Sequence, residues 1–403
     1  MTRLHARLGE MALARGVSRG WWRDLLGPVA VALLLCLPLV TMPIARDQAN
    51  WLTAAMGMMN GKVFYRDFLA FNPPGVAYAY SLALTLVGDP QYALILVHTV
   101  TVALMVIFVY LLLCDSVSRL AALMSAWTVA LWWPTSHGWW EIAQKDFLPI
   151  PWVLAATWLV FRQQSRPFAW LVFAAGVCTG VAALFKPTFA PAGLLIGCAL
   201  IVRSGITRRA GMEVLALGLG VLVSLLPTLI YLGLNGALGD AWFSTFELAP
   251  AYGSVRRAPF VRTLIVSVVL SIDLVGPWLV IPAFLGVVAF FSKRRHLWLL
   301  IPVVTFIGSA VVQGRGWPYQ LLGSVLVLLC ACTMGVAWYY RVQPGESSKT
   351  RFIVADLLTL VVAGSVLAKI VGPGTFFIPQ DFIDIPYSLH VAAFSGLVDR
   401  ESY

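Results

Sequence analysis

The chain has 403 residues, of which 60% are hydrophobic and 11% charged, and its formal net charge is +10. Soluble domains carry roughly a quarter charged residues, so this composition excludes a soluble globular protein and predicts an all-α, polytopic membrane protein. The six cysteines fall inside apolar runs, where a thiol behaves as a small hydrophobe. We therefore expect neither a disulfide nor a metal–thiolate site.

Apolar runs set the expected order of transmembrane helices. The first run, Leu25 to Val40, follows a basic segment and reaches Pro43 without a small-residue cleavage site, which predicts an uncleaved first span. The next apolar segment, Val76 to Val87, is too short to cross a bilayer, so we expect it to lie flat at the interface. The apolar runs long enough to span, including the first one, predict about eleven transmembrane helices. They begin near residues 25, 91, 120, 148, 168, 188, 212, 263, 297, 321 and 352. We expect residues 1–371 to form one transmembrane domain and residues 372–403 a short extracytoplasmic tail.

The positions of the charges predict the orientation. With the N-terminus in the cytoplasm, most of the 28 lysines and arginines fall in cytoplasmic segments, as the positive-inside rule requires. The net positive charge is thus explained by orientation and implies no nucleic-acid partner. The extracytoplasmic segments, at residues 46–75, 135–147, 233–262 and 313–320 with the tail, gather acidic residues that no orientation rule explains.

The first of these loops, RDQANWLTAAMGMMNGKVFYRDFLAFNPPG, places Asp47 at the membrane surface directly behind the first span. The residues after it have apolar side chains at near-helical spacing, which predicts a helix lying in the interface and ending at Gly61. Pro73 and Pro74 then form a rigid turn into the short apolar segment. The alternative is an ordinary loop with solvated charges.

A second group of polar and aromatic residues occupies the loop at 137–146. On a helix, Glu141 and Lys145 would share one face, and paired tryptophans beside a carboxylate are suited to holding a sugar ring. A belt of interfacial aromatic residues is the alternative for the tryptophans. His137 with Glu141 is only a weak metal signal, so no metal ligand is assigned, although a divalent metal is possible. The candidates in this loop are Trp139, Trp140, Glu141, Lys145 and Asp146.

Basic residues also occur on the outer side, where orientation alone predicts few. Lys186 follows the fifth span, Arg256 and Arg257 lie in a later loop, and Arg315 precedes the tenth span. The planar guanidinium fork matches phosphate geometry, which suits these residues to a phosphate-bearing substrate. The alternative is that the arginines balance acids or extend to lipid headgroups.

Several of these segments resemble the GT-C glycosyltransferases, and most closely the bacterial protein O-mannosyltransferase and aminoarabinose-transferase type. The resemblance is carried by the acid after the first span, the step GKVFYRDF at 61–68, NPPG at 72–75, GVAALFKP ending at Pro187, and QGRGWPYQLL at 313–322. It covers most of the chain in layout, but only these short motifs are specific.

The resemblance implies transfer of a sugar from a polyprenyl-phosphate or polyprenyl-diphosphate donor to an extracytoplasmic glycan, lipid or protein acceptor. Asp47 matches the family's general base and Asp67 its second first-loop acid, and with Glu141 they form our catalytic candidates. Arg315 and Tyr319 match the residues that bind the donor phosphate. Gln320 stands where a histidine is often found, so a proton-transfer role at that position has no support. The substrate-binding candidates are Lys145, Asp146, Lys186, Tyr319, Trp139, Trp140, Arg256, Arg257 and Arg315.

The same resemblance implies a bacterial inner (plasma) membrane protein with its active site on the extracytoplasmic face. The runner-up function is a membrane transporter or flippase of lipid-linked glycans. A secondary transporter is expected to show paired half-helices or an internal repeat with charges at the midplane, whereas the acids here gather at one surface.

Overall fold

The computed structural model describes residues 21–135, 141–163, 169–254, 259–276, 279–291, 298–313 and 318–342. Within these ranges the secondary structure is helical, with no strand. The predicted all-α membrane fold is confirmed. The predicted span near residue 352 and the expected tail at 372–403 lie outside the described residues, as do all residues after 342.

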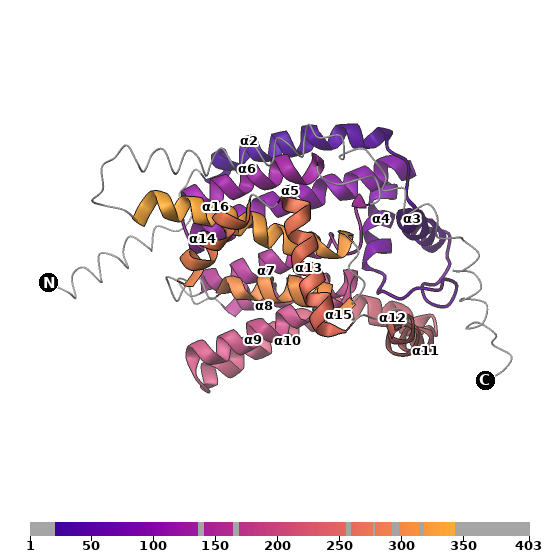
Figure 1. Cartoon of the computed structure of the whole chain (residues 1–403). Helices are drawn as coiled ribbons and strands as arrows, with labels where there is room; N and C mark the ends of the chain where they lie inside the picture. Colours follow the sequence, from indigo (N-terminus) through magenta and orange to yellow (C-terminus); the bar gives the residue numbers. More distant parts are fainter. Residues whose placement is uncertain are drawn as a thin grey trace.

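The helices include long ones that run side by side and short ones that cross them at one end (Figure 1). Short turns of 3₁₀ type at Leu37–Thr41, Pro187–Phe189 and Pro318–Leu321 and a π-type segment at Phe243–Leu248 connect some of them. The α-helices are α2 (Trp21–Cys36), α3 (Arg46–Met59), α4 (Gly75–Val87), α5 (Pro90–Ser116), α6 (Arg119–Thr135), α7 (Ile150–Gln163), α8 (Ala169–Phe185), α9 (Pro191–Ser204), α10 (Arg208–Leu234), α11 (Leu238–Trp242), α12 (Ala249–Ser254), α13 (Phe260–Val275), α14 (Val280–Phe291), α15 (Leu300–Gln313) and α16 (Leu322–Val342).

Helix boundaries follow the local sequence. α5 begins where Asp89 caps it, since its carboxylate accepts the backbone N–H groups of Gln91 at 2.8 Å and Tyr92 at 3.0 Å, and Pro90 occupies the first turn. α3 ends at Met59 with Asn60 as its C-cap, followed by Gly61 in the left-handed region with φ 83°, as the sequence predicts.

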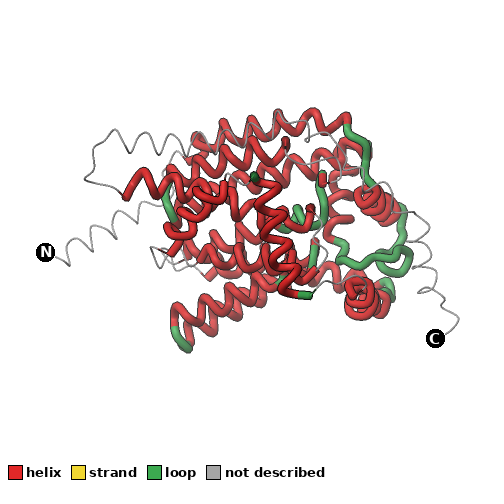
Figure 2. Tube along the Cα trace, in the orientation of Figure 1, coloured by secondary structure: helices red, strands yellow, loops and turns green. Residues whose placement is uncertain are grey.

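The predicted interfacial helices gather at one end of the bundle. Figure 1 shows α3 and α11 nearly end-on at this end, with α4 running across the direction of the long helices. The longer described loops lie there too, drawn in green in Figure 2. Gln91 at the start of α5 donates to the carbonyl of Met42 at 2.7 Å, which ties the end of the first span to the same end.

Several ion pairs lie at the opposite end of the bundle, where α9 turns into α10 (Figure 1). The buried carboxylate of Glu213 receives Arg203 at 2.7 Å and Arg209 at 3.0 Å. Asp24, at the start of α2, pairs with Arg119 at 2.6 Å. All five residues belong to the segments that the charge pattern assigns to the cytoplasm, so the structure groups them as predicted.

One predicted span is wrong. The apolar run beginning near residue 263 forms two helices, α13 and α14, because Gly276 adopts φ 114° and ends α13. Asp273 is exposed in the last turn before this break. Figure 1 shows α13 crossing the long helices instead of running along them.

The outer surface of α10 is suited to lipid. Five of the described helical segments are long and apolar enough to cross a membrane, α10 among them. One face of α10 exposes apolar side chains at helical spacing: Leu215, Leu219, Leu222, Leu226 and Ile230. A water-facing helix would carry polar residues there, so this stripe agrees with a multi-pass membrane protein.

Small residues let the helices approach closely. A Cβ atom added to Gly220 of α10 would lie 2.1 Å from the Phe173 carbonyl oxygen of α8, and one added to Gly176 of α8 would lie 2.1 Å from the Leu217 carbonyl oxygen. α14 and α16 approach in the same way at Gly286. Close backbone contact through small residues is the usual basis of helix association in membranes.

We predict that Gly220→Val separates α8 from α10 and destabilises the protein by at least about 1–3 kcal/mol, the range for overpacking. Thermal unfolding in detergent measures the effect. Gly218→Val, on the same helix, is the matched control because nothing lies within 4 Å of its added Cβ. Equal midpoints for the two variants would contradict the proposed packing.

Candidate active site

Asp47 lies in the first turn of α3, at the end of the bundle that carries the crossing helices. The partial positive charge of a helix N-terminus favours a carboxylate at this position. Its Oδ2 atom lies 3.4 Å from Lys145 Nζ, and its side chain is 30% exposed. This ion pair joins Asp47, at the start of α3, to the loop at residues 141–149.

That loop is a series of turns and not the helix that the spacing of Glu141 and Lys145 predicts. Ala143 has φ 48°, a left-handed conformation that is uncommon for a residue with a side chain. The turn directs Lys145 toward Asp47 and the ring of Tyr319, whose centroid lies 5.1 Å from Nζ. The helix on which Glu141 and Lys145 would share one face is therefore not formed.

Buried groups from three helices hold the strained turn. Gln48 of α3 donates to the Ile142 carbonyl at 2.8 Å, and Tyr80 of α4 donates to the Ala143 carbonyl at 3.0 Å. The Ala143 N–H donates to His98 Nδ1 at 3.1 Å, which places the proton of a neutral ring on Nε2. These contacts offset the cost of the left-handed backbone at this position.

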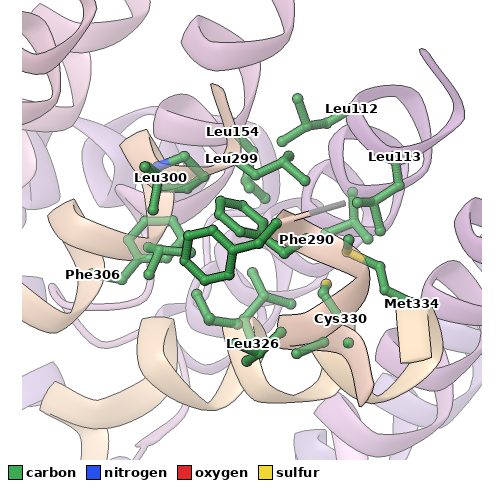
Figure 3. A pocket seen from close by; sticks show the side chains of 18 residues that line it. Leu112, Leu113, Leu154, Phe290, Leu299, Leu300, Phe306, Leu326, Cys330 and Met334 are labelled. Carbon is green, nitrogen blue, oxygen red and sulfur yellow. The ribbon is translucent and has the colours of Figure 1, made fainter. Parts of the chain in front are cut away.

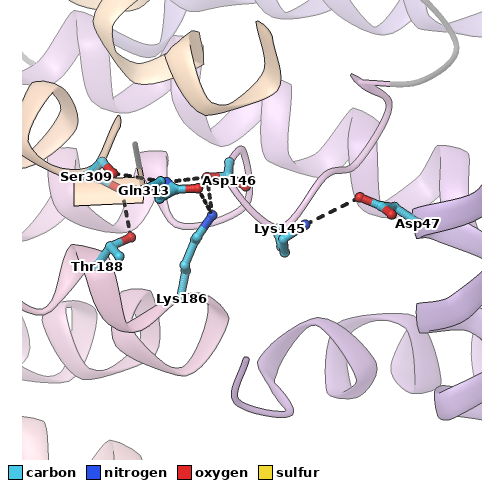
Figure 4. A network of polar contacts seen from close by, with 7 residues as sticks. All are labelled: Asp47, Lys145, Asp146, Lys186, Thr188, Ser309 and Gln313. Atoms are coloured by element: carbon cyan, nitrogen blue, oxygen red, sulfur yellow. Dashed lines mark hydrogen bonds and ion pairs between the residues drawn. The ribbon is translucent and has the colours of Figure 1, made fainter. Parts of the chain in front are cut away.

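A second ion pair lies deeper, between Lys186 and Asp146 (Figure 4). Lys186 Nζ lies 2.5 Å from Asp146 Oδ1 and donates to Gln313 Oε1 at 2.6 Å. Gln313 Nε2 donates to the same carboxylate oxygen at 2.9 Å, which closes a triangle. Gln313 also contacts Ser309 on its own helix, whose hydroxyl lies 2.7 Å from that of Thr188. α15 is thereby joined to the segment after α8.

The first loop also packs against the segment that leads into Lys186 and so helps to fix its position. A Cβ atom on Gly75, the glycine of NPPG, would lie 2.5 Å from the Leu184 carbonyl oxygen. Only glycine fits so close to this backbone. The start of α4 is therefore packed directly against the chain that leads into Lys186.

The two lysines differ in their electrostatics. Burial lowers the pKa of Lys186 to about 8, and the nearby charge of Asp146 offsets burial only in part. Burial also opposes the charge on Lys145, but Tyr319, Asp47 and Asp146 outweigh it and raise the pKa of Lys145 above its usual value. Lys145 therefore stays protonated throughout the physiological range.

The structure places Asp67 apart from this network. Its carboxylate accepts the Val63 N–H at 2.6 Å and pairs with Arg66 at 3.1 Å. Arg66 in turn donates to the Asn235 carbonyl at 3.2 Å. The hydrogen bond from Arg66, followed by that from Val63, lowers the pKa of Asp67. These contacts shape the loop, and the catalytic role suggested for Asp67 stays a prediction.

The other candidates are distributed as follows. Glu141 is half-buried at the start of the turn segment, and Gln320 is buried beside Tyr319. The structure thus brings together Asp47, Lys145, Asp146, Lys186 and Tyr319. The remaining candidates, Trp139, Trp140, Arg256, Arg257 and Arg315, lie outside the described residues, as does His137.

Gln313 is the residue that sequence reasoning missed. It opens the QGRGWPYQLL motif, but a glutamine at the end of an apolar span gives no sign of its partners. Gln48 and His98 were missed for the same reason, since each is a single polar residue in a helix. The motif that Gln313 opens was the available signal for this residue, whereas no motif pointed to the partners of Gln48 and His98.

An apolar cavity of about 240 Å³ lies among α5, α7, α14, α15 and α16 (Figure 3). Its lining includes Leu112, Phe290, Phe306, Leu326 and Met334. Phe306 lies on the same face of α15 as Ser309 and Gln313, at spacings of three and seven residues. At 1.5 Å per residue the cavity lining begins about 10 Å along the helix from Gln313.

No metal site is formed by the part of the chain that the structure describes. Within those ranges, no three histidine, cysteine, aspartate or glutamate side chains converge. The carboxylates of Asp47 and Asp146 each have a lysine as partner instead. No residue is therefore assigned as a metal ligand.

The fold is shared with other solved structures. The chain is similar to ArnT from Cupriavidus metallidurans bound to undecaprenyl phosphate, with a TM-score of 0.59 and 18% identity over 87% of this chain and 65% of that one. It is also similar to the archaeal oligosaccharyltransferase AglB from Archaeoglobus fulgidus in complex with an inhibitory peptide and a dolichol-phosphate, with a TM-score of 0.57 and 11% identity over 94% of this chain and 60% of that one. The chain thus spans less than two-thirds of the length of either.

This likeness in fold agrees with the resemblance to the GT-C glycosyltransferases seen in the loop motifs. Residues 72–231 match the family model described as Dolichyl-phosphate-mannose-protein mannosyltransferase. The matched region contains Lys145, Asp146 and Lys186 and begins at the NPPG motif. No curated protein matches the chain.

We predict that Lys186→Met and Asp146→Leu each destabilise the protein by about 3–5 kcal/mol, because each leaves the partner charge buried and unpaired. The double variant should lose much less than the sum, since it removes both charges. Thermal unfolding in detergent provides the measurement. Lys145→Met is the control and should cost less than about 1 kcal/mol, because its pair with Asp47 is partly exposed. Additive losses in the double variant would show that the deeper pair is not a coupled unit.

Proposed function

We propose that this protein is a glycosyltransferase that moves a sugar from a polyprenyl-phosphate or polyprenyl-diphosphate donor to an extracytoplasmic acceptor, with Asp47 as general base. The observation that carries the proposal is the meeting of Asp47, Lys145, Asp146, Lys186 and Gln313 at the end of the bundle where α3 and α4 cross the long helices. Separate segments supply these groups, and only the fold brings them together.

The chemistry of the cluster suits displacement of a lipid phosphate from an anomeric carbon. That reaction needs a base near the acceptor hydroxyl and cations near the departing phosphate. The partly exposed carboxylate of Asp47 is available as the base. Lys145 and Lys186 provide positive charge a short distance away, and Tyr319 lies beside Lys145.

The apolar cavity supports a lipid-linked donor. Phe306 lines this cavity, and Ser309 and Gln313 of the polar cluster follow on the same face of α15. An isoprenoid chain is purely apolar, and a phosphate at its end carries charge. The same order of apolar and polar surface along α15 fits such a molecule better than it fits a soluble sugar nucleotide.

The related structures agree with this assignment. ArnT is described as bound to undecaprenyl phosphate and AglB as in complex with a dolichol-phosphate. The matching family model is described in terms of a dolichyl-phosphate sugar donor. From the resemblance we further propose a bacterial inner membrane location, and from the charge pattern a cytoplasmic N-terminus with this cluster on the extracytoplasmic face.

We predict that Asp47→Asn keeps the shape of the site and still binds the donor but lowers turnover by about two to four orders of magnitude, the usual contribution of a positioned base. The polyprenyl-linked sugar that accumulates in cells lacking the protein identifies the donor. Single-turnover transfer by purified protein, with this donor in excess, then measures the effect.

Asp67→Asn is the matched control, since its carboxylate is engaged with Arg66 and Val63 and should affect transfer less. Near-normal transfer by Asp47→Asn would remove this residue from catalysis. If no polyprenyl-linked sugar or surface glycan changes in cells lacking the protein, the proposed function is wrong.

A further inference from the structure

The two ion pairs of the cluster, Lys186–Asp146 and Lys145–Asp47, differ in the length of their contacts. Lys186 has two short contacts, at 2.5 Å to Asp146 and 2.6 Å to Gln313, and its side chain is 6% exposed. Lys145 lies 3.4 Å from Asp47, well beyond the 2.7–2.9 Å or so of a strong charge-assisted hydrogen bond. The deeper pair is therefore locked, and the outer pair is loose.

The Lys145 ammonium has more N–H donors than its contact with Asp47 uses. An ammonium group has three N–H donors. Among the described residues, Asp47 is the one carboxylate within ion-pair distance of Lys145, and the Tyr319 ring holds the ammonium without accepting a conventional hydrogen bond. The Lys145 ammonium can therefore turn toward a new anion while its position is kept by the ring.

The charge balance makes such an exchange necessary when an anion enters. The carboxylates of Asp47 and Asp146 balance the two lysines in the described part of the site. A phosphate adds negative charge, and Lys186 is already bonded to Asp146 and Gln313. Of the two described lysines, Lys145 is the looser and more exposed cation, so an entering phosphate competes with Asp47 for it.

We propose that Lys145 is a shared counter-ion, paired with Asp47 before the donor binds and transferred to the donor phosphate when it arrives. This inference rests on the proposed function and adds an order of events to it. Donor binding uncovers Asp47 Oδ2, which can then accept the proton of the acceptor hydroxyl. No covalent bond or proton moves in the exchange itself, and Lys145 acts as a positioning residue for Asp47.

The exchange predicts that Asp47 weakens binding of the donor phosphate through Lys145. The probe is undecaprenyl phosphate, with undecaprenol as the uncharged control, and native mass spectrometry of the purified full chain measures the dissociation constants. We expect Asp47→Asn to bind undecaprenyl phosphate about two- to fivefold more tightly than wild type, the range for release of a partly exposed ion pair. Lys145→Met should bind about tenfold more weakly, as loss of a charged hydrogen bond requires.

The double variant, Asp47→Asn with Lys145→Met, is the decisive one. Because the gain from Asp47→Asn acts through Lys145, it should disappear in the Lys145→Met background. A gain that persists there reflects simple removal of negative charge and overturns the exchange, as does wild-type affinity in Lys145→Met.

A different result would exclude the proposed function. If wild type binds undecaprenyl phosphate no better than undecaprenol, the lipid-phosphate donor is excluded and the exchange is overturned with it. If wild type prefers the phosphate and Lys145→Arg restores the affinity lost in Lys145→Met, both are supported. Elution as a single species in size-exclusion chromatography verifies that each variant is folded.

Discussion

A buried ammonium must be neutralised and hydrogen-bonded, and this requirement at Lys186 organises the site. Leaving such a charge unpaired would cost several kcal/mol, so the groups that satisfy it are held firmly. Asp146 comes from the turn after α6 and Gln313 from the end of α15. The position of Lys186 is fixed in turn by the close contact between Gly75 and Leu184. One electrostatic constraint therefore joins four distant parts of the chain.

The neighbouring pair depends on this locked core. Lys145 precedes Asp146 in the same turn, so fixing Asp146 also fixes the backbone from which Lys145 reaches Asp47. The strained conformation at Ala143 has the same effect, since hydrogen bonds from Tyr80 and to His98 maintain it. A rigid inner pair thus supports an outer pair that is loose enough to respond to a ligand.

α15 connects the polar site with the apolar interior. Gln313 belongs to the ion-pair network, and Phe306 lines the cavity two turns away on the same helix face. α15 therefore presents an apolar residue and polar residues on one face, the order that a molecule with an apolar chain and a charged head requires. This arrangement distinguishes the site from the charged clusters at the opposite end, where Glu213 is already paired with Arg203 and Arg209.

The sequence predicted the parts of this protein that depend on hydrophobic length and short motifs. Spans such as α5 and α10 follow from their apolar runs, and Asp47, Lys186 and Tyr319 follow from the loop motifs. It could not predict pairings between distant segments. Glu141 and Lys145 have helical spacing, but tertiary contacts impose turns there. Gln313 was missed because its partners Lys186 and Asp146 are more than 100 residues away in sequence.

We propose that the ion-pair cluster and the apolar cavity form one site for a lipid phosphate. Photo-crosslinking with a polyprenyl phosphate that carries a diazirine on its chain tests it directly, with mass spectrometry locating the labelled residues. We expect labels on the cavity lining, at residues such as Phe306 and Met334, that excess undecaprenyl phosphate suppresses and undecaprenol does not. Labels confined to the exposed stripe of α10 at Leu215 to Ile230, or labels that undecaprenol suppresses equally, would contradict it.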